Sequence, residues 1–452
     1  MSVFFGTDGL RGKVGQDLNY DIAFKCGNSL ALLMGNKGKV VVGRDTRVTG
    51  SYLQNAISAG LMAGGVDVYD VGIIPTAGIS YITKSCGFDF GIIITASHNP
   101  SEYNGIKIIS SLGEKITDLQ EEEIERGFIK SKIVEYSKIG QCITDKRFAS
   151  KYFNHIISSA TICLCGLKIV VDGSNGASCN IAPKIFKKLG ATVYKINCRN
   201  KGLDINNKCG SLHPESLIKK VKKLKADFGV AFDGDADRII VIDSNGKVID
   251  GDMIILALAK YYKDLGLLKN NTVVGTSQTN MGIEQDLKNC GIQLERADVG
   301  DKYVIALMNK HSVMLGGEQS GHIIIKRFLP TGDGILTAVQ LACACRHKNI
   351  SISKLCEATI FPQTNINVEV KDKIRILGNE KLAIAISNAK QELAGNGRVL
   401  VRASGTEPKI RIMVEGENQR VTNSLAEYLE KLILSLEQEE NWYVWNCLFS
   451  RK

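Results

Sequence analysis

Short runs of apolar residues recur along the chain and alternate with amphipathic stretches. The runs at residues 39–42, 66–71, 88–94, 167–171, 227–232 and 272–274 predict buried strands. Helices are predicted from about residue 51, over 116–128, 146–158 and 180–189, from residue 281, and over 334–345. Strands that alternate with helices in this way predict parallel or mixed sheets covered by helices.

Three of these strands open a similar succession of strand, polar glycine-containing loop and helix, beginning at residues 39, 167 and 272. This repetition indicates related α/β domains. Residues 365–438 follow a different order of strand, helix, strand, strand and helix, which predicts a separate and smaller domain. Linkers are expected between the helices at 116–128 and 146–158 and at residues 361–364.

Composition is that of a soluble globular protein, with 44% hydrophobic and 23% charged residues in 452. This length suggests about three domains, or four small ones. No stretch is long and apolar enough to span a bilayer, and residues 1–12 lack the features of a signal peptide, so we expect a cytoplasmic protein without a membrane partner. The 13 cysteines form no Cys-x-x-Cys motif, which argues against zinc fingers and redox motifs and suits a reducing compartment.

The formal charge of +10 does not alter the prediction of a soluble globular protein. Its densest basic run, residues 219–225, carries no interleaved aromatic residues, so a solvated helix face is expected and a nucleic-acid partner is not. A basic balance also suits small anionic substrates such as sugar phosphates.

The first candidate catalytic motif is TASHNP, residues 95–100, which follows directly after the strand at 88–94. Ligand groups of open α/β sheets gather at such strand ends. Ser97 is a candidate nucleophile and His98 a candidate base, although adjacency in sequence does not by itself give the geometry of such a pair. A polar turn that ends at Asn99-Pro100 is the alternative. Lys107 is expected near this loop because the intervening connection is short.

A second candidate is DGDADR, residues 233–238, which follows the strand at 227–232. Asp233, Asp235 and Asp237 would repel one another without a cation, and oxygen ligands favour Mg²⁺. A calcium loop of the EF-hand type does not fit, because Arg238 and Ser244 stand where glycine and glutamate are required. The alternative is an acidic surface turn.

Three further motifs are rich in glycine. In GTDGLRG, residues 6–12, Arg11 is a candidate phosphate clamp, and an ordinary glycine turn is the alternative. In GGEQSGH, residues 316–322, Glu318 and Ser320 are candidates for binding sugar hydroxyls, and a hairpin is the alternative.

The third is RASGTEP, residues 402–408, a composition suited to a dianionic phosphate. The alternative is again a hairpin turn. Its candidate phosphate ligands, with one arginine from the following strand, are Arg402, Ser404, Gly405, Thr406 and Arg411.

Taken together and in this order, the motifs resemble those of the alpha-D-phosphohexomutase family. The resemblance implies that Ser97 is the phosphoserine, that the three aspartates bind Mg²⁺ together with Ser97, and that Glu318 and Ser320 bind the sugar. Residues 5–12, 202–211 and 317–322 are most similar to bacterial members that act on glucosamine phosphates.

The fold implied is α/β, with four domains around a central cleft: three related mixed α/β domains and a smaller α+β C-terminal domain. We place the phosphoserine loop in residues 1–155, the metal-binding loop in 156–252, the sugar loop in 253–364 and the phosphate loop in 365–440. Residues 441–452 form a tail without an assigned role.

The activity implied is the interconversion of glucosamine 6-phosphate and glucosamine 1-phosphate, which supplies UDP-N-acetylglucosamine and cell-wall synthesis. Phosphorylated Ser97 would form a 1,6-bisphosphate intermediate, and a 1,6-bisphosphate would also act as activator. The partner is then a small hexosamine phosphate, in a monomer or homodimer. Lys107 and Arg11 are candidates for the region of proton transfer, with Lys107 the base if its pKa is lowered. Arg238 lies beside the metal loop. His98 is a candidate for orienting Ser97, and a purely structural role is the alternative.

Some positions depart from the family pattern. Ala403 stands where proline is usual, Lys302 where arginine is usual, and residues 277–280 are atypical. Lys302 loses the planar fork with which arginine binds phosphate. Two alternative functions remain: a sister mutase acting on mannose or glucose phosphates, and a non-catalytic sugar-phosphate sensor.

Overall fold

The computed structural model describes residues 5–6, 8–130, 133–199, 201–404 and 408–449, with side chains as far as residue 438. The chain divides into two compact units. The first comprises residues 1–279 and 287–357, and the second comprises residues 280–286 and 358–452.

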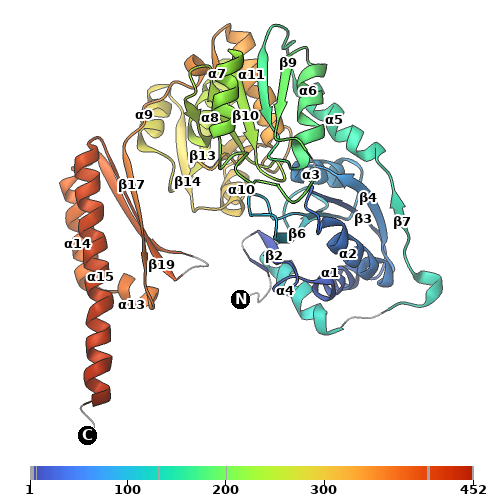
Figure 1. Cartoon of the computed structure of the whole chain (residues 1–452), viewed down its shortest axis with the longest axis horizontal. Coiled ribbons are helices and arrows are strands. Elements are labelled where there is room, and N and C mark those ends of the chain that lie inside the picture. The colour runs from blue at the N-terminus through green and yellow to red at the C-terminus, as the bar shows by residue number, and fades with distance from the viewer. Residues whose placement is uncertain (1–4, 7, 131–132, 200, 405–407, 450–452) are drawn as a thin grey trace. The chain divides into compact units, whose positions relative to one another are not determined.

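The N-terminal part of the first unit is built on a seven-stranded sheet in the order β1-β2-β6-β5-β3-β4-β7 (Figure 1). Its strands are β1 (Phe5–Gly6), β2 (Gly9–Lys13), β3 (Lys39–Arg44), β4 (Asp67–Ile73), β5 (Phe90–Ile94), β6 (Tyr103–Ser110) and β7 (Cys142–Thr144). β3, β4, β5 and β7 run parallel, and β6 pairs antiparallel with β5.

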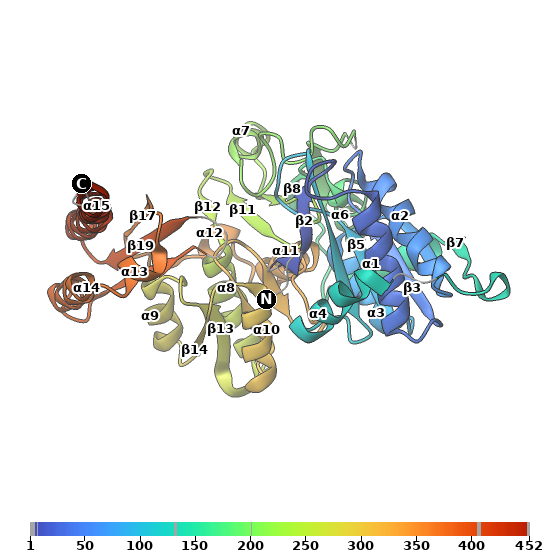
Figure 2. The ribbon, with the colours of Figure 1, turned by 90° about the horizontal axis from the view of Figure 1, so that it is seen from below.

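Helices cover both faces of this sheet (Figure 2). Val40, Val42, Ile92 and Ile94, at alternate positions of β3 and β5, share one core with α1 (Tyr20–Leu33) and α2 (Gly50–Ala63). α4 (Asp118–Gly127) joins the same core through Ile124. α3 (Thr76–Ser85) packs on β5 and on α5 (Arg147–Ser159).

Two smaller sheets complete the first unit. The order β12-β11-β10-β8-β9 is formed by β8 (Lys168–Asp172), β9 (Thr192–Ile196), β10 (Phe228–Phe232), β11 (Ile239–Asp243) and β12 (Val248–Ile249). The order β14-β13-β15-β16 is formed by β13 (Thr272–Thr276), β14 (Gln293–Ala297), β15 (Leu315–Gly317) and β16 (Ile323–Ile325). Their helices are α6 (Ala182–Lys188), α7 (Glu215–Leu224), α8 (Gly251–Asp264), α10 (Asp301–Lys310), α11 (Gly334–Lys348) and α12 (Ile352–Leu355). The helix α9 (Met281–Asn289) begins among the residues of the second unit and ends among those of the first.

The helix α11 holds these sheets together. It is buried from Gly334 to Cys345, and it packs against α5, α8 and β11. A helix that is apolar on all sides is stable only when protein surrounds it, and α11 occupies such a position.

The second unit has a three-stranded antiparallel sheet in the order β17-β19-β18 (Figure 1). The strands are β17 (Gln363–Glu369), β18 (Gly397–Ala403) and β19 (Lys409–Gly416). One apolar core joins them to α13 (Lys373–Leu377), α14 (Glu380–Glu392) and α15 (Gln419–Phe449). The expected mixed α/β architecture with a distinct C-terminal α+β part is therefore confirmed. The central cleft stays a prediction.

Several local expectations were wrong. The expected linker before α5 contains β7, because Cys142–Thr144 extends the sheet beside Val68–Asp70 of β4. The expected linker at 361–364 already contains the start of β17 at Gln363, and α15 continues through the expected tail to Phe449. Gly9–Lys13 is a strand rather than a glycine loop, because it pairs with β6.

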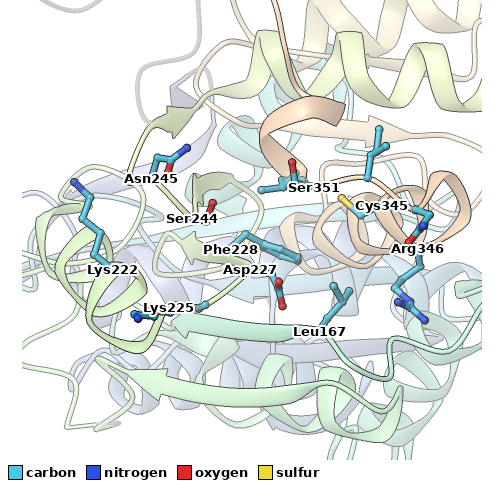
Figure 3. Close-up of a pocket in the computed structure, with 14 residues that line it drawn as sticks. Leu167, Lys222, Lys225, Asp227, Phe228, Ser244, Asn245, Cys345, Arg346 and Ser351 are labelled. Carbon is cyan, nitrogen blue, oxygen red and sulfur yellow. The ribbon is translucent and has the colours of Figure 1, made fainter.

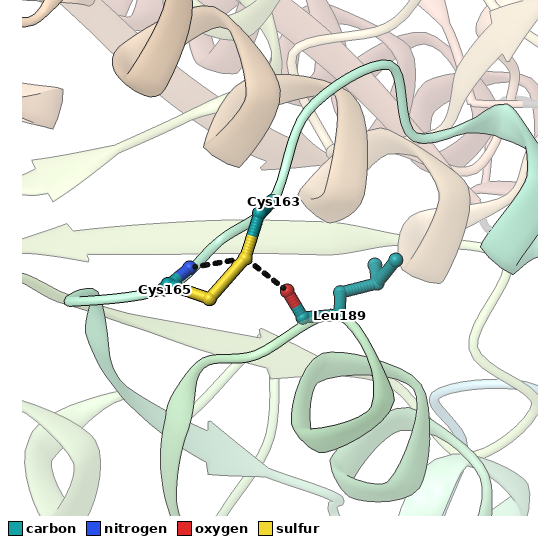
Figure 4. The surroundings of a disulfide bond; sticks show 3 residues. All are labelled: Cys163, Cys165 and Leu189. Atoms are coloured by element: carbon teal, nitrogen blue, oxygen red, sulfur yellow. Dashed lines mark hydrogen bonds between the residues drawn. A yellow bond between two sulfur atoms is a disulfide. The ribbon is translucent and has the colours of Figure 1, made fainter.

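The cysteines also differ from expectation at one place. Cys163 and Cys165 form a disulfide two positions apart, on the loop between α5 and β8 (Figure 4). The Cys163 sulfur accepts a hydrogen bond from the Cys165 amide at 3.2 Å and lies 3.6 Å from the Leu189 carbonyl oxygen. Ten other described cysteines are free.

None of the described helices combines the length and the apolar character that crossing a membrane requires.

Candidate active site

Ser97 sits at the carboxyl end of β5, in the loop that turns back into β6. It is buried, and its φ of 49° lies in the left-handed region, which a serine adopts only when its surroundings hold it there. Thr95 provides part of that hold, because its hydroxyl accepts from the Ser97 amide at 2.9 Å and donates to Asp45 at 2.7 Å. The loop therefore presents Ser97 in one fixed conformation.

Arg47 also fixes the conformation of the Ser97 loop. The sequence analysis did not identify this residue. Its guanidinium donates to the carbonyl oxygens of Ser97 at 3.0 Å and Asn99 at 2.8 Å. It also donates to the carbonyls of Pro100 and Tyr103. Asp45 accepts from Nε at 3.0 Å, and both side chains of this ion pair are completely buried. The available signal was the GRDTR sequence, residues 43–47, which begins at the end of β3, the strand directly beside β5.

The DGDADR loop follows β10 and gathers its three carboxylates. Asp233, Asp235 and Asp237 are buried, and each offers an oxygen within 4.8 Å of the others. Burial, with the charges of Asp237 and Asp235, raises the pKa of Asp233 well above its usual value. Oδ1 of Asp235 and Oδ1 of Asp237 are buried without a hydrogen-bond partner among the described residues. Orphaned oxygens in a crowded acidic loop are the arrangement that a divalent cation satisfies, so these residues fit a metal site.

This loop contacts the Ser97 loop directly. The Ser97 hydroxyl donates to Asp233 Oδ2 at 2.6 Å. The two backbones also approach closely, since a Cβ on Gly234 would lie 2.6 Å from the Ser97 carbonyl oxygen. Asn206 closes the contact by donating its side-chain amide to the carbonyls of Ser97 at 2.8 Å and Asn99 at 3.1 Å. Only glycine permits this approach at position 234.

Lys107 is brought beside the same carboxylates, as its short connection to the Ser97 loop predicted. Its Nζ lies 3.0 Å from Asp235, 3.2 Å from Asp237 and 3.1 Å from Asp8. Burial alone would lower the pKa of Lys107, but the three carboxylates together raise it well above its ordinary value. These contacts do not meet the condition set for Lys107 as the base, which was a lowered pKa, and the role of Lys107 in proton transfer stays a prediction.

Arg11 and Lys115 belong to the same charge network through Asp8. Arg11 donates to Asp8 at 2.6 Å, and Lys115 binds both Asp8 and Asp301, the latter at 2.5 Å. Burial would raise the pKa of Asp8, but Lys107, Lys115 and Arg11 hold it well below its usual value. Sequence reasoning missed Asp8, Lys115 and Asp301, because nothing in their own motifs signals partners more than 90 positions away.

His98 lies beside Ser97 with its Nδ1 3.3 Å from the hydroxyl oxygen. Burial, together with the charges of Arg238 and Arg11, lowers the pKa of His98 to about 4. The imidazole is therefore neutral near pH 7, and it is suited to hydrogen bonding rather than to carrying charge.

The sugar loop candidates reach this site through Arg238. The Arg238 amide donates to Asp233 at 3.2 Å, and its backbone pairs with His322 at the end of the β15–β16 hairpin. Glu318 lies in that hairpin, where burial raises its pKa in spite of the charges of His322 and Arg238. Ser320 is exposed in the same turn. The hairpin alternative for residues 316–322 was thus correct as a description of the backbone, and it places Glu318 near the charge network.

The phosphate-loop candidates gather in the second unit. Arg402 of β18 and Arg411 of β19 are directly paired across the strands, and Arg411 donates to the Ser404 hydroxyl at 3.4 Å. Burial and the charge of Arg411 lower the pKa of Arg402. Lys373 adds a third cation, donating to the Ser404 carbonyl at 2.8 Å. Gly405 and Thr406 lie outside the described residues.

Four family models match the chain in succession. They are alpha/beta/alpha domains I, II and III of phosphoglucomutase/phosphomannomutase, at residues 2–134, 150–246 and 250–361, and the C-terminal domain at residues 366–432. Among curated proteins, the phosphoglucosamine mutase of Alkaliphilus oremlandii is 41% identical, over 96% of this chain and 99% of its own length. That of Brevibacillus brevis is 42% identical, over 92% and 95%.

Solved structures share the fold. A phosphoglucomutase/phosphomannomutase family protein from Burkholderia thailandensis superposes with a TM-score of 0.81 at 24% identity, covering 97% of this chain and 98% of that one. The N-acetylphosphoglucosamine mutase of Aspergillus fumigatus, in complex with GlcNAc-6P and magnesium, has a TM-score of 0.64 at 16% identity, covering 97% and 96%. Four consecutive domain matches and full-length relatives agree with the strand-end site, and the chain belongs to the phosphoglucomutase/phosphomannomutase family.

Proposed function

We propose that this chain is an isomerase that interconverts glucosamine 6-phosphate and glucosamine 1-phosphate through a phosphorylated Ser97. The observation that carries this proposal is the Ser97 hydroxyl, buried at a strand end and 2.6 Å from an aspartate of the acidic loop. Support for the substrate comes from full-length relatives about 41% identical that are named phosphoglucosamine mutase. A serine held against a metal-binding loop suits phosphoryl transfer, which depends mostly on alignment and charge stabilisation.

The reaction has two transfers. In the first, the bond between the Ser97 oxygen and phosphorus breaks as the free hydroxyl of the sugar monophosphate attacks, giving a 1,6-bisphosphate and a free serine. The bisphosphate then reverses its orientation, and its other phosphate returns to Ser97. A trace of 1,6-bisphosphate would activate the enzyme by phosphorylating any unmodified Ser97.

The acidic loop would hold one Mg²⁺ through Asp233, Asp235 and Asp237, with Ser97 or its phosphate as a further ligand. When bound, Mg²⁺ would supply positive charge to the transferred phosphoryl group. The unpartnered oxygens of Asp235 and Asp237 support this assignment.

The surrounding side chains have electrostatic and positioning roles in this proposal. Lys107 and Arg11 place fixed positive charge beside the transferred group, which compensates its developing negative charge. His98 stays neutral and orients the Ser97 hydroxyl from 3.3 Å. Arg47 acts through the backbone of the Ser97 loop and is a positioning residue.

Substrate recognition is divided between two loops. Glu318 and Ser320, with Arg238, would bind the sugar hydroxyls shared by glucosamine and glucose. The phosphate that does not react would bind Arg402, Ser404, Gly405, Thr406 and Arg411. The proposed domains are residues 1–155, 156–252, 253–364 and 365–440, each contributing one of the four functional loops.

A coupled assay tests the activity. Purified protein is given glucosamine 6-phosphate, Mg²⁺ and a trace of glucose 1,6-bisphosphate, and formation of glucosamine 1-phosphate is followed. We expect kcat/KM to be higher for glucosamine 6-phosphate than for glucose 6-phosphate or mannose 6-phosphate, with residual turnover of glucose 6-phosphate. An equal or higher value for mannose 6-phosphate would assign the sister activity. Binding of all three sugar phosphates without turnover would instead identify a sensor.

A further inference from the structure

A second pocket lies in the first unit at the amino end of β10. Its volume is about 700 Å³, within the range of small-molecule sites. Five segments line it: the start of β8, the end of α7, the start of β10, the turn between β11 and β12, and the stretch from the end of α11 into α12 (Figure 3). A cavity built from five segments has walls that are fixed by the fold.

Positive charge dominates the lining. Lys222, Lys225 and Arg346 line the pocket, and none of them forms an ion pair within the part of the chain that the structure describes. Asp227 is the one carboxylate among the lining residues, and its Oδ2 already accepts a hydrogen bond from the Lys168 amide at 2.6 Å. Three cationic side chains line the pocket, and its one carboxylate already accepts a hydrogen bond. The pocket therefore carries a net positive charge.

The cations are placed at two ends of the pocket. In Figure 3, Lys222 and Lys225 lie at one end and Arg346 at the other, with Ser244 between them. Lys222 is laid along the β11–β12 turn, since a Cβ on Gly246 would be 2.9 Å from its Nζ. Asn245 and Ser351 add hydrogen-bonding groups to the lining.

This pocket is separate from the candidate active site. Asp227 and Phe228 are at the amino end of β10, whereas Asp233 follows its carboxyl end at Phe232. A five-residue strand is about 17 Å long. Neither Ser97 nor any of the three metal-loop aspartates lines the pocket, so its ligand is not at the site of phosphoryl transfer.

We propose that this pocket binds a small sugar or polyol bisphosphate, with one phosphate on Lys222 and Lys225 and the other on Arg346. Two separated groups of cations match two separated anionic groups, and arginine and lysine are the usual phosphate ligands. A nucleotide fits less well, because Phe228 is the aromatic side chain in the lining and is only 1% exposed, which leaves no ring face for a base to stack on.

Calorimetric titration with fructose 1,6-bisphosphate tests the proposal. The wild-type chain should bind at a site that saturating glucosamine 1-phosphate does not block, because that sugar phosphate occupies only the active site. The double variant Lys222→Ala, Arg346→Ala should bind there at least tenfold more weakly and keep kcat/KM for glucosamine 6-phosphate within twofold. The matched control is Lys223→Ala, an exposed lysine of the same helix that does not line the pocket.

Two results would overturn the proposal. One is complete competition by glucosamine 1-phosphate, which would mean that all bisphosphate binds at the active site. The other is unchanged binding in the double variant. Inorganic phosphate should bind the wild-type pocket at least tenfold more weakly than the bisphosphate, because it engages one end only, and equal affinity would refute a two-ended ligand.

Discussion

The Ser97 hydroxyl donates a 2.6 Å hydrogen bond to Asp233, 136 positions further along the chain. This contact joins the loop after β5 to the loop after β10, and it predicts that Ser97 carries the phosphoryl group. Ser97→Ala should abolish turnover and remove phosphate from the peptide containing residues 95–100. Peptide mapping by mass spectrometry, with the assay described above, measures both. Ser101→Ala, in the same loop, is the control and should keep both phosphate and activity. An active Ser97→Ala enzyme would contradict the proposal.

The close approach of Gly234 to Ser97 predicts a position that tolerates no side chain. In Gly234→Ala the new Cβ would lie 2.6 Å from the Ser97 carbonyl oxygen and 2.9 Å from the Ile205 side chain, so the two loops must move apart. Because a misplacement of about 1 Å can cost about 100-fold in rate, we expect kcat to fall at least tenfold while the protein stays folded. In the control Gly378→Ala the new Cβ has no neighbour closer than 3.4 Å, and its kcat should be unchanged. Unaltered kcat in Gly234→Ala would show that the loops are not held at this distance.

The unpartnered oxygens of Asp235 and Asp237 predict that a divalent cation stabilises the fold. A ligand that binds only the folded state stabilises it by RT ln(1 + [L]/Kd) and therefore raises the unfolding temperature as its concentration rises above Kd. Millimolar Mg²⁺ should therefore raise the Tm of the wild-type chain, and a chelator should reverse the rise. Asp237→Asn should lose most of this shift, while the exposed Asp298→Asn should retain it. This measurement does not depend on activity. If Mg²⁺ does not change the Tm of the wild type, the proposal of a bound metal is contradicted.

The parts of this site that could be predicted from sequence are those whose signal is local. An apolar run that ends in a polar loop marks a strand end, and both the Ser97 loop and the Asp233 loop were found in this way. Three aspartates at alternate positions likewise predict a cation-binding site, and this prediction needs no information from the rest of the chain.

Features that depend on distant partners could not be predicted. Nothing in the sequence assigned a role to Arg47, and only the pairing of β3 with β5 brings it to the Ser97 loop. The direction of the Lys107 pKa shift depends on how many carboxylates surround the amine, and this number depends on contacts with residues far along the chain. The strand β7 was missed because three residues are too few for a periodic pattern.

Tyr152 and Asp333 form a buried pair whose titration predicts a pH-dependent stability. The Tyr152 hydroxyl donates to Asp333 at 2.9 Å, and Asp333 caps α11 by accepting from the Ile335 and Leu336 amides. Burial raises the pKa of Asp333 from 3.8 to about 6. The folded state therefore binds this proton more tightly than the unfolded state, so the group costs stability above pH 6, and the cost is removed as the pH falls toward 4. Two pKa units correspond to about 3 kcal/mol.

Asp333→Asn removes this titration while keeping an oxygen that can cap the helix. The Tm of the wild type minus that of the variant should therefore rise as the pH is lowered from 7.5 to 5. Tyr152→Phe removes a hydrogen bond that lowers the pKa of Asp333. The pH range over which the stability of this variant changes should therefore lie at higher pH than in the wild type. Thermal unfolding of the three proteins across this range gives the comparison, and a difference that does not vary with pH would disprove the assignment.

Arg47 should be required for the rate although it lies behind the loop that carries the reacting group. Its guanidinium binds four carbonyl oxygens of the Ser97 loop while Asp45 fixes its other edge. Lysine keeps the charge but has three donors on one atom, so Arg47→Lys cannot reach carbonyls on both sides of the loop. We expect kcat to fall by about 10- to 100-fold with a smaller change in KM, because the loop that positions Ser97 relaxes while the sugar-binding groups remain.

Arg44→Lys, at a partly buried arginine at the end of β3, is the matched control and should leave kcat unchanged. A merely structural role would lower Tm and leave kcat per folded molecule intact, so activity is normalised to the folded fraction from thermal unfolding. Normal kcat at full folding in Arg47→Lys would show that the carbonyl contacts do not position Ser97.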